Sequence, residues 1–194
     1  PIISFKGPLL ALQAYGNLAL RQFNDLDILV SPSNLDRAIK LLIDSGFVPQ
    51  NDLRWFERKD WYLSRIKDVV FVDEKSEYIL ELHWKLSGAH FAYPMENERL
   101  WQNSEIKTLA GVDVNVLNFN DLLIYLCLHG SRHSWERFSW ICDLNELIQS
   151  RDEIDWRQIG EDAKRVGCEN ILGLGLLLIN KFFATKTPIP NWEN

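Results

Sequence analysis

The hydrophobic pattern of the chain changes near residue 118, and this change limits the folds that the chain can adopt. Before it, short apolar runs alternate with amphipathic stretches, which is typical of strands and helices in one α/β unit. After it, apolar residues recur at helical spacing as far as Phe183. No linker rich in Pro, Gly or Ser separates the two parts. We therefore expect an α/β unit at 1–117 and a helical unit at 118–194 packed against it.

Local patterns place individual elements within this frame. Gly7-Pro8 and Ser31-Pro32-Ser33 are start signals for helices, because Pro is favoured in the first turn and Ser at the cap. The predicted strands are 2–5, 25–30, 55–59, 62–67, 69–73, 78–84 and a pair within 107–117. The predicted helices of the second part are 122–129, 135–149, 155–166 and 170–183.

The charge balance restricts the partners of the chain. Its 194 residues carry 21 Lys and Arg against 27 Asp and Glu, a formal net charge of −6. A protein that binds long nucleic acids needs a basic surface, so we expect no such partner. A few placed cations and a metal ion could still hold one nucleotide. Nothing in the sequence indicates the oligomeric state.

Cysteine usage and the apolar runs bear on the compartment. Three scattered Cys residues are too few for a disulfide framework or a zinc site, and they suggest reduced thiols in a cytoplasmic protein. No apolar run reaches the ~18 residues of a membrane span, so we expect no membrane partner. The sequence shows no signal peptide, and since it begins at Pro1 we expect that further residues precede it.

Asp25 and Asp27 are the sharpest chemical signal. Residues two apart on a strand point to the same face, so the two carboxylates project together while Leu26, Ile28 and Val30 face the core. Adjacent carboxylates repel unless protons or cations neutralise them, and Mg²⁺ is a natural partner. The alternative is a strand start with acids that face solvent.

Lys6 and Gly7 precede this strand at a strand-to-helix junction. A glycine there lets a phosphate approach the backbone, and the helix N-terminus offers free N–H groups. Lys6 adds a positive charge, although it could equally be a surface lysine before a turn. Arg21 lies in the loop before the second strand. It could clamp a phosphate with its guanidinium, or form a buried ion pair that orients Asp25 or Asp27.

A third carboxylate is expected from the strand at 78–84. Alternation places Glu81 and His83 on one face, opposite Leu80, Leu82 and Trp84. A third carboxylate beside Asp25 and Asp27 would complete a site for two metal ions. Asp73 is the rival, but a charged residue in the middle of a strand demands a reason, which favours Glu81.

Two further histidines lie in the helical part. His129 and His133 are four residues apart and therefore share one helix face, with Arg132 and Arg137 nearby. They could contact the substrate or a phosphate, or be interior histidines that bond to Asp143 or the backbone. A zinc pair is a weaker interpretation, because a third ligand at suitable spacing is missing.

These segments together resemble one known family. The run of Phe5-Lys6-Gly7, Tyr15-Gly16, Arg21 and Asp25 to Val30 resembles the uncharacterised nucleotidyltransferase family of the DNA polymerase β superfamily. Glu81-Leu82-His83-Trp84, and His129 to Trp135 followed by Asp143-Leu144, resemble later elements of that family in the same order. One departure from the broader superfamily is Lys6-Gly7-Pro8, which stands where a Gly-Ser or Gly-Gly pair is usual.

The resemblance implies a fold and a reaction. The expected fold is α+β, a nucleotidyltransferase-type mixed sheet with flanking helices followed by a C-terminal helical subdomain. The expected cofactors are two Mg²⁺ ions with an NTP as donor. Asp25, Asp27 and Glu81 fall on the carboxylate positions that hold the metal, and Lys6, Gly7 and Arg21 are candidates for the phosphates. His83, His129 and His133 are candidates for substrate contacts.

The leading hypothesis is therefore transfer of an NMP from an NTP to an unidentified small-molecule, peptide or protein acceptor. The alternative is a binding or regulatory module of the same fold, antitoxin-like and without turnover, although such a module would be free to lose its carboxylates. A small-molecule kinase fits less well. It would need an Asp after His129-Gly130, where this chain has Ser131.

Overall fold

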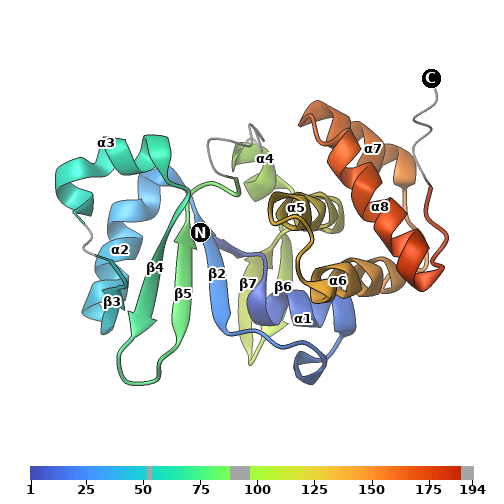
Figure 1. Ribbon diagram of the computed structural model, residues 1–194. Helices are drawn as coiled ribbons and strands as arrows, with labels where there is room; N and C mark the ends of the chain where they lie inside the picture. The colour runs from blue at the N-terminus through green and yellow to red at the C-terminus, as the bar shows by residue number, and fades with distance from the viewer. Residues whose placement is uncertain (52–53, 88–96, 189–194) are drawn as a thin grey trace. The chain divides into compact units, whose positions relative to one another are not determined.

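The computed structural model describes residues 1–51, 54–87 and 97–188 and divides them into two units (Figure 1). One unit comprises Pro1–Leu10 and Arg21–Leu117, and the other comprises Ala11–Leu20 and the described part of Asn118–Asn194. The chain thus divides near residue 118, but Ala11–Leu20 belongs to the helical unit, although we had expected it in the α/β unit. Residues 189–194, assigned to the helical unit from the sequence, lie outside the described residues.

The first unit is built on a mixed seven-stranded sheet in the order β3-β4-β5-β2-β1-β7-β6. Strand β2 lies between β5, to which it runs parallel, and β1, to which it runs antiparallel. This sheet confirms the expected α+β fold, and the strands predicted near 2–5, 25–30, 69–73, 78–84 and 107–117 are present. The strands are β1 (Ile2–Ser4), β2 (Asp25–Val30), β3 (Phe47–Pro49), β4 (Asp68–Asp73), β5 (Ile79–His83), β6 (Glu105–Leu109) and β7 (Val112–Val116).

Helices complete the two units. Helix α1 (Gly7–Tyr15) follows β1 and crosses the boundary between the units. The α/β unit also contains the 3₁₀ turn η2 (Pro32–Asn34), α2 (Leu35–Asp44), α3 (Trp55–Arg65) and α4 (Asn97–Gln102). The helical unit contains η1 (Leu18–Leu20), α5 (Phe119–Arg132), α6 (Phe138–Gln149), α7 (Trp156–Arg165) and α8 (Glu169–Phe183). No helix among the described residues is both long and apolar enough to cross a membrane.

The strands predicted at 55–59 and 62–67 are wrong, because this segment is helix α3. Trp55 is buried, and Tyr62 and Leu63 pack against the same core cluster. The backbone of Arg58 leaves the helical conformation (φ −131°, ψ 29°), so the segment is kinked between Trp55 and the later pair, and its two parts bring these side chains to the same core. The aromatic residues in this segment suggested β structure, yet its charged residues occupy the outer side of a helix. Trp55 also donates from Nε1 to Asp36 of α2 at 2.7 Å.

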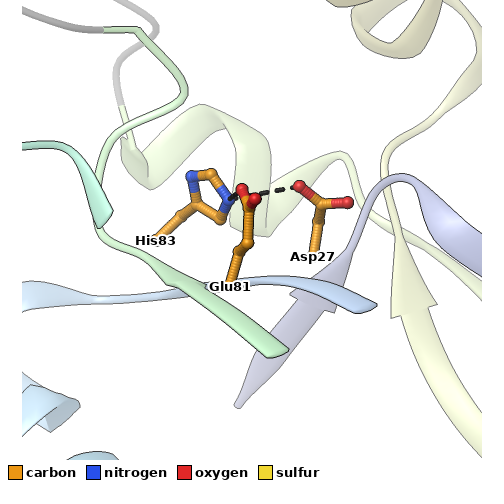
Figure 2. Close-up of side chains that lie close together, drawn as sticks. All are labelled: Asp27, Glu81 and His83. Carbon is orange, nitrogen blue, oxygen red and sulfur yellow. Dashed lines mark hydrogen bonds and ion pairs between the residues drawn. The ribbon is translucent and has the colours of Figure 1, made fainter. Parts of the chain in front are cut away.

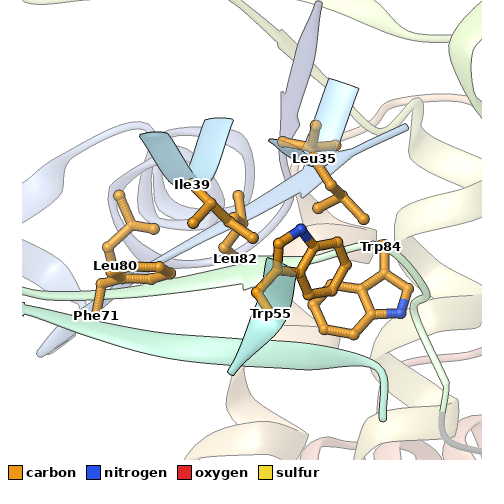
Figure 3. Packing of buried hydrophobic residues seen from close by; sticks show 8 residues of the cluster. Leu35, Ile39, Trp55, Phe71, Leu80, Leu82 and Trp84 are labelled. Carbon is orange, nitrogen blue, oxygen red and sulfur yellow. The ribbon is translucent and has the colours of Figure 1, made fainter. Parts of the chain in front are cut away.

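One face of the sheet packs against α2 and α3 and forms a hydrophobic core. Its buried members are Val30, Leu35, Ile39, Trp55, Phe71, Leu80, Leu82 and Trp84 (Figure 3). The core takes Leu80, Leu82 and Trp84 from β5 and the residue after it, and Leu26 and Ile28 of β2 pack against it. The predicted alternation is therefore confirmed on both strands. As a consequence, Asp27, Glu81 and His83 lie on the opposite face of the sheet.

The helical unit is held together by close packing between its helices. A Cβ atom added at Gly175 of α8 would lie 2.5 Å from Sγ of Cys127 on α5, so glycine lets these two helices approach. Helix α5 begins with Asn118, whose side chain accepts from the backbone N–H of Asp121 at 2.9 Å. Tyr15, at the end of α1, donates to the buried Asp143 of α6 at 2.9 Å.

The end of α5 is shaped by Trp135. The backbone N–H of Trp135 donates to Gly130 at 2.8 Å and that of Ser134 donates to Ser131 at 3.1 Å, which is the Schellman pattern of helix termination. A Cβ added at Gly130 would lie 2.4 Å from the Trp135 ring. The glycine in the sequence His-Gly-Ser-Arg-His-Ser-Trp therefore makes room for the tryptophan five residues later.

This packing predicts opposite effects for two glycine substitutions within helices. We expect Gly130→Ala to be destabilised by about 2 kcal/mol relative to Gly160→Ala, because the new methyl group overlaps the Trp135 ring. At Gly160 of α7 no atom of the described ranges lies within 4 Å of an added Cβ, so alanine there should stabilise the helix by up to about 1 kcal/mol. Urea denaturation of both variants measures the difference. Equal stabilisation by both substitutions would show that Gly130 does not serve this packing.

Candidate metal centre

The register of two parallel strands brings a buried carboxylate and a second acidic residue together. Strands β2 and β5 pair so that Asp27 lies opposite Glu81, and Leu29 lies opposite His83. His83 follows Glu81 by two residues and thus shares its face of β5. Asp27 and His83 are buried, and Glu81 keeps a quarter of its side chain exposed. Glu81 is therefore the member of this set that faces solvent.

Figure 2 shows these three side chains converging. Nε2 of His83 lies 3.2 Å from Oδ1 of Asp27 and 3.2 Å from Oε2 of Glu81. One ligand atom of each residue lies within 4.8 Å of the others, which makes a group able to hold a metal ion. Asp27, Glu81 and His83 are called the Asp27–Glu81–His83 group below.

His83 is held from two further sides. The ring of Phe5 meets the imidazole edge to face, with centroids 5.0 Å apart. Nδ1 of His83 faces Oδ2 of Asp68 at 3.5 Å, and Lys67 forms an ion pair with the same Asp68 oxygen. Asp68 was missed from the sequence. The signal was nevertheless present, because a tight β4–β5 turn after Asp73 places residue 68 opposite residue 83.

The α/β unit contains the three residues predicted to bind phosphates, Lys6, Gly7 and Arg21, and they lie near Asp25 and Asp27. Nζ of Lys6 lies 2.7 Å from Oδ1 of Asp27, so in this structure the ammonium neutralises a carboxylate. Nη1 of Arg21 donates to the carbonyl of Gly7 at 3.4 Å. Gly7 has a φ of +56°, and a Cβ there would lie 2.6 Å from the carbonyl oxygen of Asp25. Glycine is thus required by the close approach of β2.

Asp25 and Asp73 occupy different surroundings. Among the described residues, Asp25 is not a member of the group of potential ligands that contains Asp27. Burial raises the pKa of Asp25, the negative charge of Asp27 raises it further, and Lys6 opposes both. Asp73 instead accepts from the backbone of Lys75 at 3.1 Å in the turn after β4. Its carboxylate serves that turn.

The charges of the group are set by its neighbours. Burial alone would raise the pKa of Asp27, but the hydrogen bond from His83 and the charge of Lys6 outweigh it and lower the pKa to about 2. The hydrogen bond from His83 also lowers the pKa of Glu81 against the opposing effects of burial and Asp27. Both carboxylates are therefore ionised at neutral pH and available as ligands.

The residues present fit a divalent cation. Oδ2 of Asp27 is buried and has no hydrogen-bond partner among the described residues, although an unpaired buried carboxylate oxygen is costly. A cation bound between Asp27 and Glu81 would contact Oδ1 of Asp27, which lies on the side of His83 and Glu81 (Figure 2), and it would reach Oδ2 only if Asp27 bound it through both oxygens. Carboxylates are the preferred ligands of Mg²⁺, and an imidazole is acceptable to Mn²⁺ and later transition ions.

His129 and His133 lie in the helical unit, in a cluster of rings. The two imidazoles are 4.8 Å apart, and each packs against Trp140 of α6, at 4.9 and 5.4 Å. The Arg137 guanidinium lies 5.8 Å from the centre of the Trp140 ring. Within the described ranges, no third potential ligand joins these histidines in a metal-binding group. The ring contacts of these histidines include each other and Trp140.

Chains of three solved structures are among those that match this chain. An antigenic nucleotidyltransferase-like protein from Paracoccidioides brasiliensis matches with a TM-score of 0.50 and 14% identity, over 95% of this chain and 89% of that chain. The solution structure of the antibiotic-resistance factor ANT(2'')-Ia matches with a TM-score of 0.46 and 10% identity, over 95% of this chain and 84% of that chain. The crystal structure of ANT(2'')-Ia in complex with adenylyl-2''-tobramycin matches with a TM-score of 0.46 and 10% identity, over 90% of this chain and 86% of that chain. At 14% identity, the likeness to the Paracoccidioides brasiliensis protein concerns the fold alone.

A search of curated protein sequences gives no match. The family comparison is more informative, because it covers most of the chain. The model of the uncharacterised nucleotidyltransferase family matches residues 1–184, which include the whole sheet, the Asp27–Glu81–His83 group and helices α5 to α8. The chain therefore belongs to the uncharacterised nucleotidyltransferase family.

Proposed function

We propose that the chain is a Mg²⁺-dependent nucleotidyltransferase that moves an NMP from an NTP to a small-molecule, peptide or protein acceptor. The observation that carries the proposal is the register of β2 and β5, which places the buried Asp27 opposite Glu81 on the face of the sheet away from the core. Family membership supports the same reaction class. The net charge of −6 disfavours a long nucleic acid as the acceptor.

Asp27 and Glu81 are proposed to bind the metal, and Asp25 is proposed to join them when a nucleotide brings the second ion. The influence of Asp27 and Glu81 on the pKa of Asp25 supports its proximity to the group. When bound, the ions would neutralise the triphosphate and promote attack by the acceptor oxygen. The chain must therefore hold three ionised carboxylates close together. The positive charge of Lys6 reduces the repulsion between them.

Lys6, Gly7 and Arg21 are proposed to serve the triphosphate end of the donor. Lys6 supplies a positive charge 2.7 Å from Asp27, so a phosphate that approaches the same carboxylate through a metal ion would also meet this ammonium. The guanidinium of Arg21 lies by the Gly7 carbonyl. It is also close enough to Asp25 for its charge to oppose the rise in the pKa of that carboxyl. Both cations thus belong to the neighbourhood of the carboxylates.

The reaction is tested with two differently labelled nucleotides. The protein is incubated with Mg²⁺, a pool of small molecules and peptides, and NTP labelled at the α- or the γ-phosphate. We expect α-label in an acceptor with one pyrophosphate released per transfer. Asp73→Asn, a carboxylate change in a turn of the same unit, should leave the rate unchanged.

Two other outcomes would overturn the proposal. Transfer of the γ-label would identify a phosphotransferase. Saturable NTP binding without transfer of either label to any acceptor, or to the protein itself, would favour a binding or regulatory module of this fold.

A further inference from the structure

We infer that His83 is itself a ligand of the divalent ion, that Asp68 orients it, and that the resulting nitrogen-containing site prefers Mn²⁺ to Mg²⁺. The inference rests on the metal centre of the proposed function. It adds a ligand and a metal preference that a site of carboxylates alone would lack.

The first observation is the position of Nε2 of His83. This nitrogen lies 3.2 Å from an oxygen of Asp27 and 3.2 Å from an oxygen of Glu81. Two ligand atoms at right angles around an ion, each about 2.1 Å from it, lie about 3 Å apart. A single N–H group must be shared between the two carboxylates, which weakens each hydrogen bond, whereas one cation can contact all three atoms. The spacing therefore suits shared coordination better than hydrogen bonding.

The second observation is the other ring nitrogen. Nδ1 of His83 makes no hydrogen bond to any residue that the structure describes, but it faces Oδ2 of Asp68 at 3.5 Å. A histidine that binds a metal almost always offers its second nitrogen to a carboxylate, a carbonyl or a water, which fixes the tautomer and leaves the first nitrogen free to coordinate. Lys67 pairs with the same Asp68 oxygen and stabilises its negative charge.

The third observation is that the imidazole is immobilised. His83 is 1% exposed, and its ring meets that of Phe5 at 76°. Neither β5 nor the core on its far side requires a histidine here, since an apolar residue would fill a buried position at lower cost. A buried imidazole of fixed orientation between two ionised carboxylates is therefore well suited to bind a cation.

The metal preference follows from the donor atoms. Mg²⁺ prefers oxygen ligands in a strict octahedron, whereas Mn²⁺ accepts imidazole nitrogen together with carboxylates. Replacement of the nitrogen by an oxygen should therefore shift the preference toward Mg²⁺. Because this effect concerns the ratio of two affinities, it differs from the general weakening that a disturbed fold would cause.

The first test uses Mn²⁺ alone and pulsed electron paramagnetic resonance. We expect the Mn²⁺ complex of the full chain to show coupling to one histidine nitrogen, which changes from the ¹⁴N to the ¹⁵N pattern when the protein is made with ¹⁵N-histidine. The coupling should persist in His129→Gln and disappear in His83→Asp. A stoichiometric Mn²⁺ complex without histidine coupling would overturn the inference.

The second test measures affinities for Mn²⁺ and Mg²⁺ by calorimetry. We expect the chain to bind Mn²⁺ at least ~10-fold more tightly than Mg²⁺, and His83→Asp to reduce this ratio several-fold. Asp68→Asn should weaken Mn²⁺ binding ~10-fold, as loss of an outer carboxylate commonly does, while Asp73→Asn on the same strand should not. An unchanged ratio in His83→Asp would contradict a nitrogen ligand.

These results separate the inference from the proposed function. Nucleotidyl transfer by a protein whose bound Mn²⁺ shows no histidine coupling would leave the function standing and remove His83 from the ligand set. Histidine coupling in a protein that transfers no label would support the ligand set and reject the reaction.

Discussion

Asp27→Asn is expected to reduce nucleotidyl transfer by ~10²–10³-fold. Loss of a single group that stabilises charge in a transition state commonly costs ~10²–10³-fold, and Asp27 is proposed to hold the ion that carries this role. The amide keeps the size of the side chain but offers only one weak oxygen ligand. Divalent metal affinity, measured by calorimetry without nucleotide, should fall in parallel.

The same substitution should also destabilise the metal-free protein, by about 2 kcal/mol at neutral pH. This figure corresponds to the lowering of the Asp27 pKa from 3.8 to about 2, which stabilises the charged form in the folded state. The stabilisation is present above pH 4 and is lost as the pH falls toward 2. The difference between wild type and variant should therefore shrink over that range in urea unfolding experiments.

A second variant separates the two effects. Lys6 pairs with Asp27, so Asp27→Asn leaves an ammonium near a neutral amide. We expect the double variant with Lys6→Met to recover part of the lost stability but none of the activity, because replacing both partners of a buried pair is less costly than removing one. Recovery of activity together with stability would show that Asp27 acts by supporting the fold.

Gly7→Ala is expected to have the largest effect on stability among the site variants, about 3 kcal/mol. The new methyl group would lie 2.6 Å from the carbonyl oxygen of Asp25, and the φ of +56° adds the usual cost of a left-handed conformation. The contact is with the backbone of β2, so it cannot be relieved by rotation of a side chain. Displacement of β2 should also weaken metal binding.

Gly16→Ala is the matched control for this prediction. Gly16 has a similar φ of +66°, but nothing lies within 4 Å of an added Cβ. Its cost should therefore be the conformational part alone, about 1 kcal/mol, with metal affinity unchanged. Equal destabilisation of the two variants in urea would show that Gly7 is required only for its backbone conformation.

Much of the sheet and of the candidate site could be predicted from local pattern. Alternation along 25–30 and 78–84 is sufficient to assign the core side of each strand and to group Asp27, Glu81 and His83 on the other. These strands are regular and have one buried face, so a shift by one residue would expose the core. The roles of these residues in binding stay predictions.

Other features depended on contacts between distant parts of the chain. The aromatic residues of α3 suggested strands, because their helical face becomes evident only with the core against which Trp55 packs. Gly7 suggested a phosphate loop, which stays a prediction, and its close contact with the carbonyl of residue 25 becomes evident only in the folded chain. Asp68 belongs to no sequence motif, and only the pairing of the two strands shows that it lies opposite His83.

The binding of a metal ion by Asp27 and Glu81 is tested most directly by locating a divalent ion in crystals grown with Mn²⁺ and a non-hydrolysable NTP analogue. Mn²⁺ scatters anomalously, so its site can be located independently of the protein coordinates. We expect an anomalous peak within about 2.3 Å of oxygens of both Asp27 and Glu81, with the triphosphate bound to the same ion. A triphosphate and Mn²⁺ bound elsewhere, with Asp27 still paired only with Lys6 and His83, would contradict it.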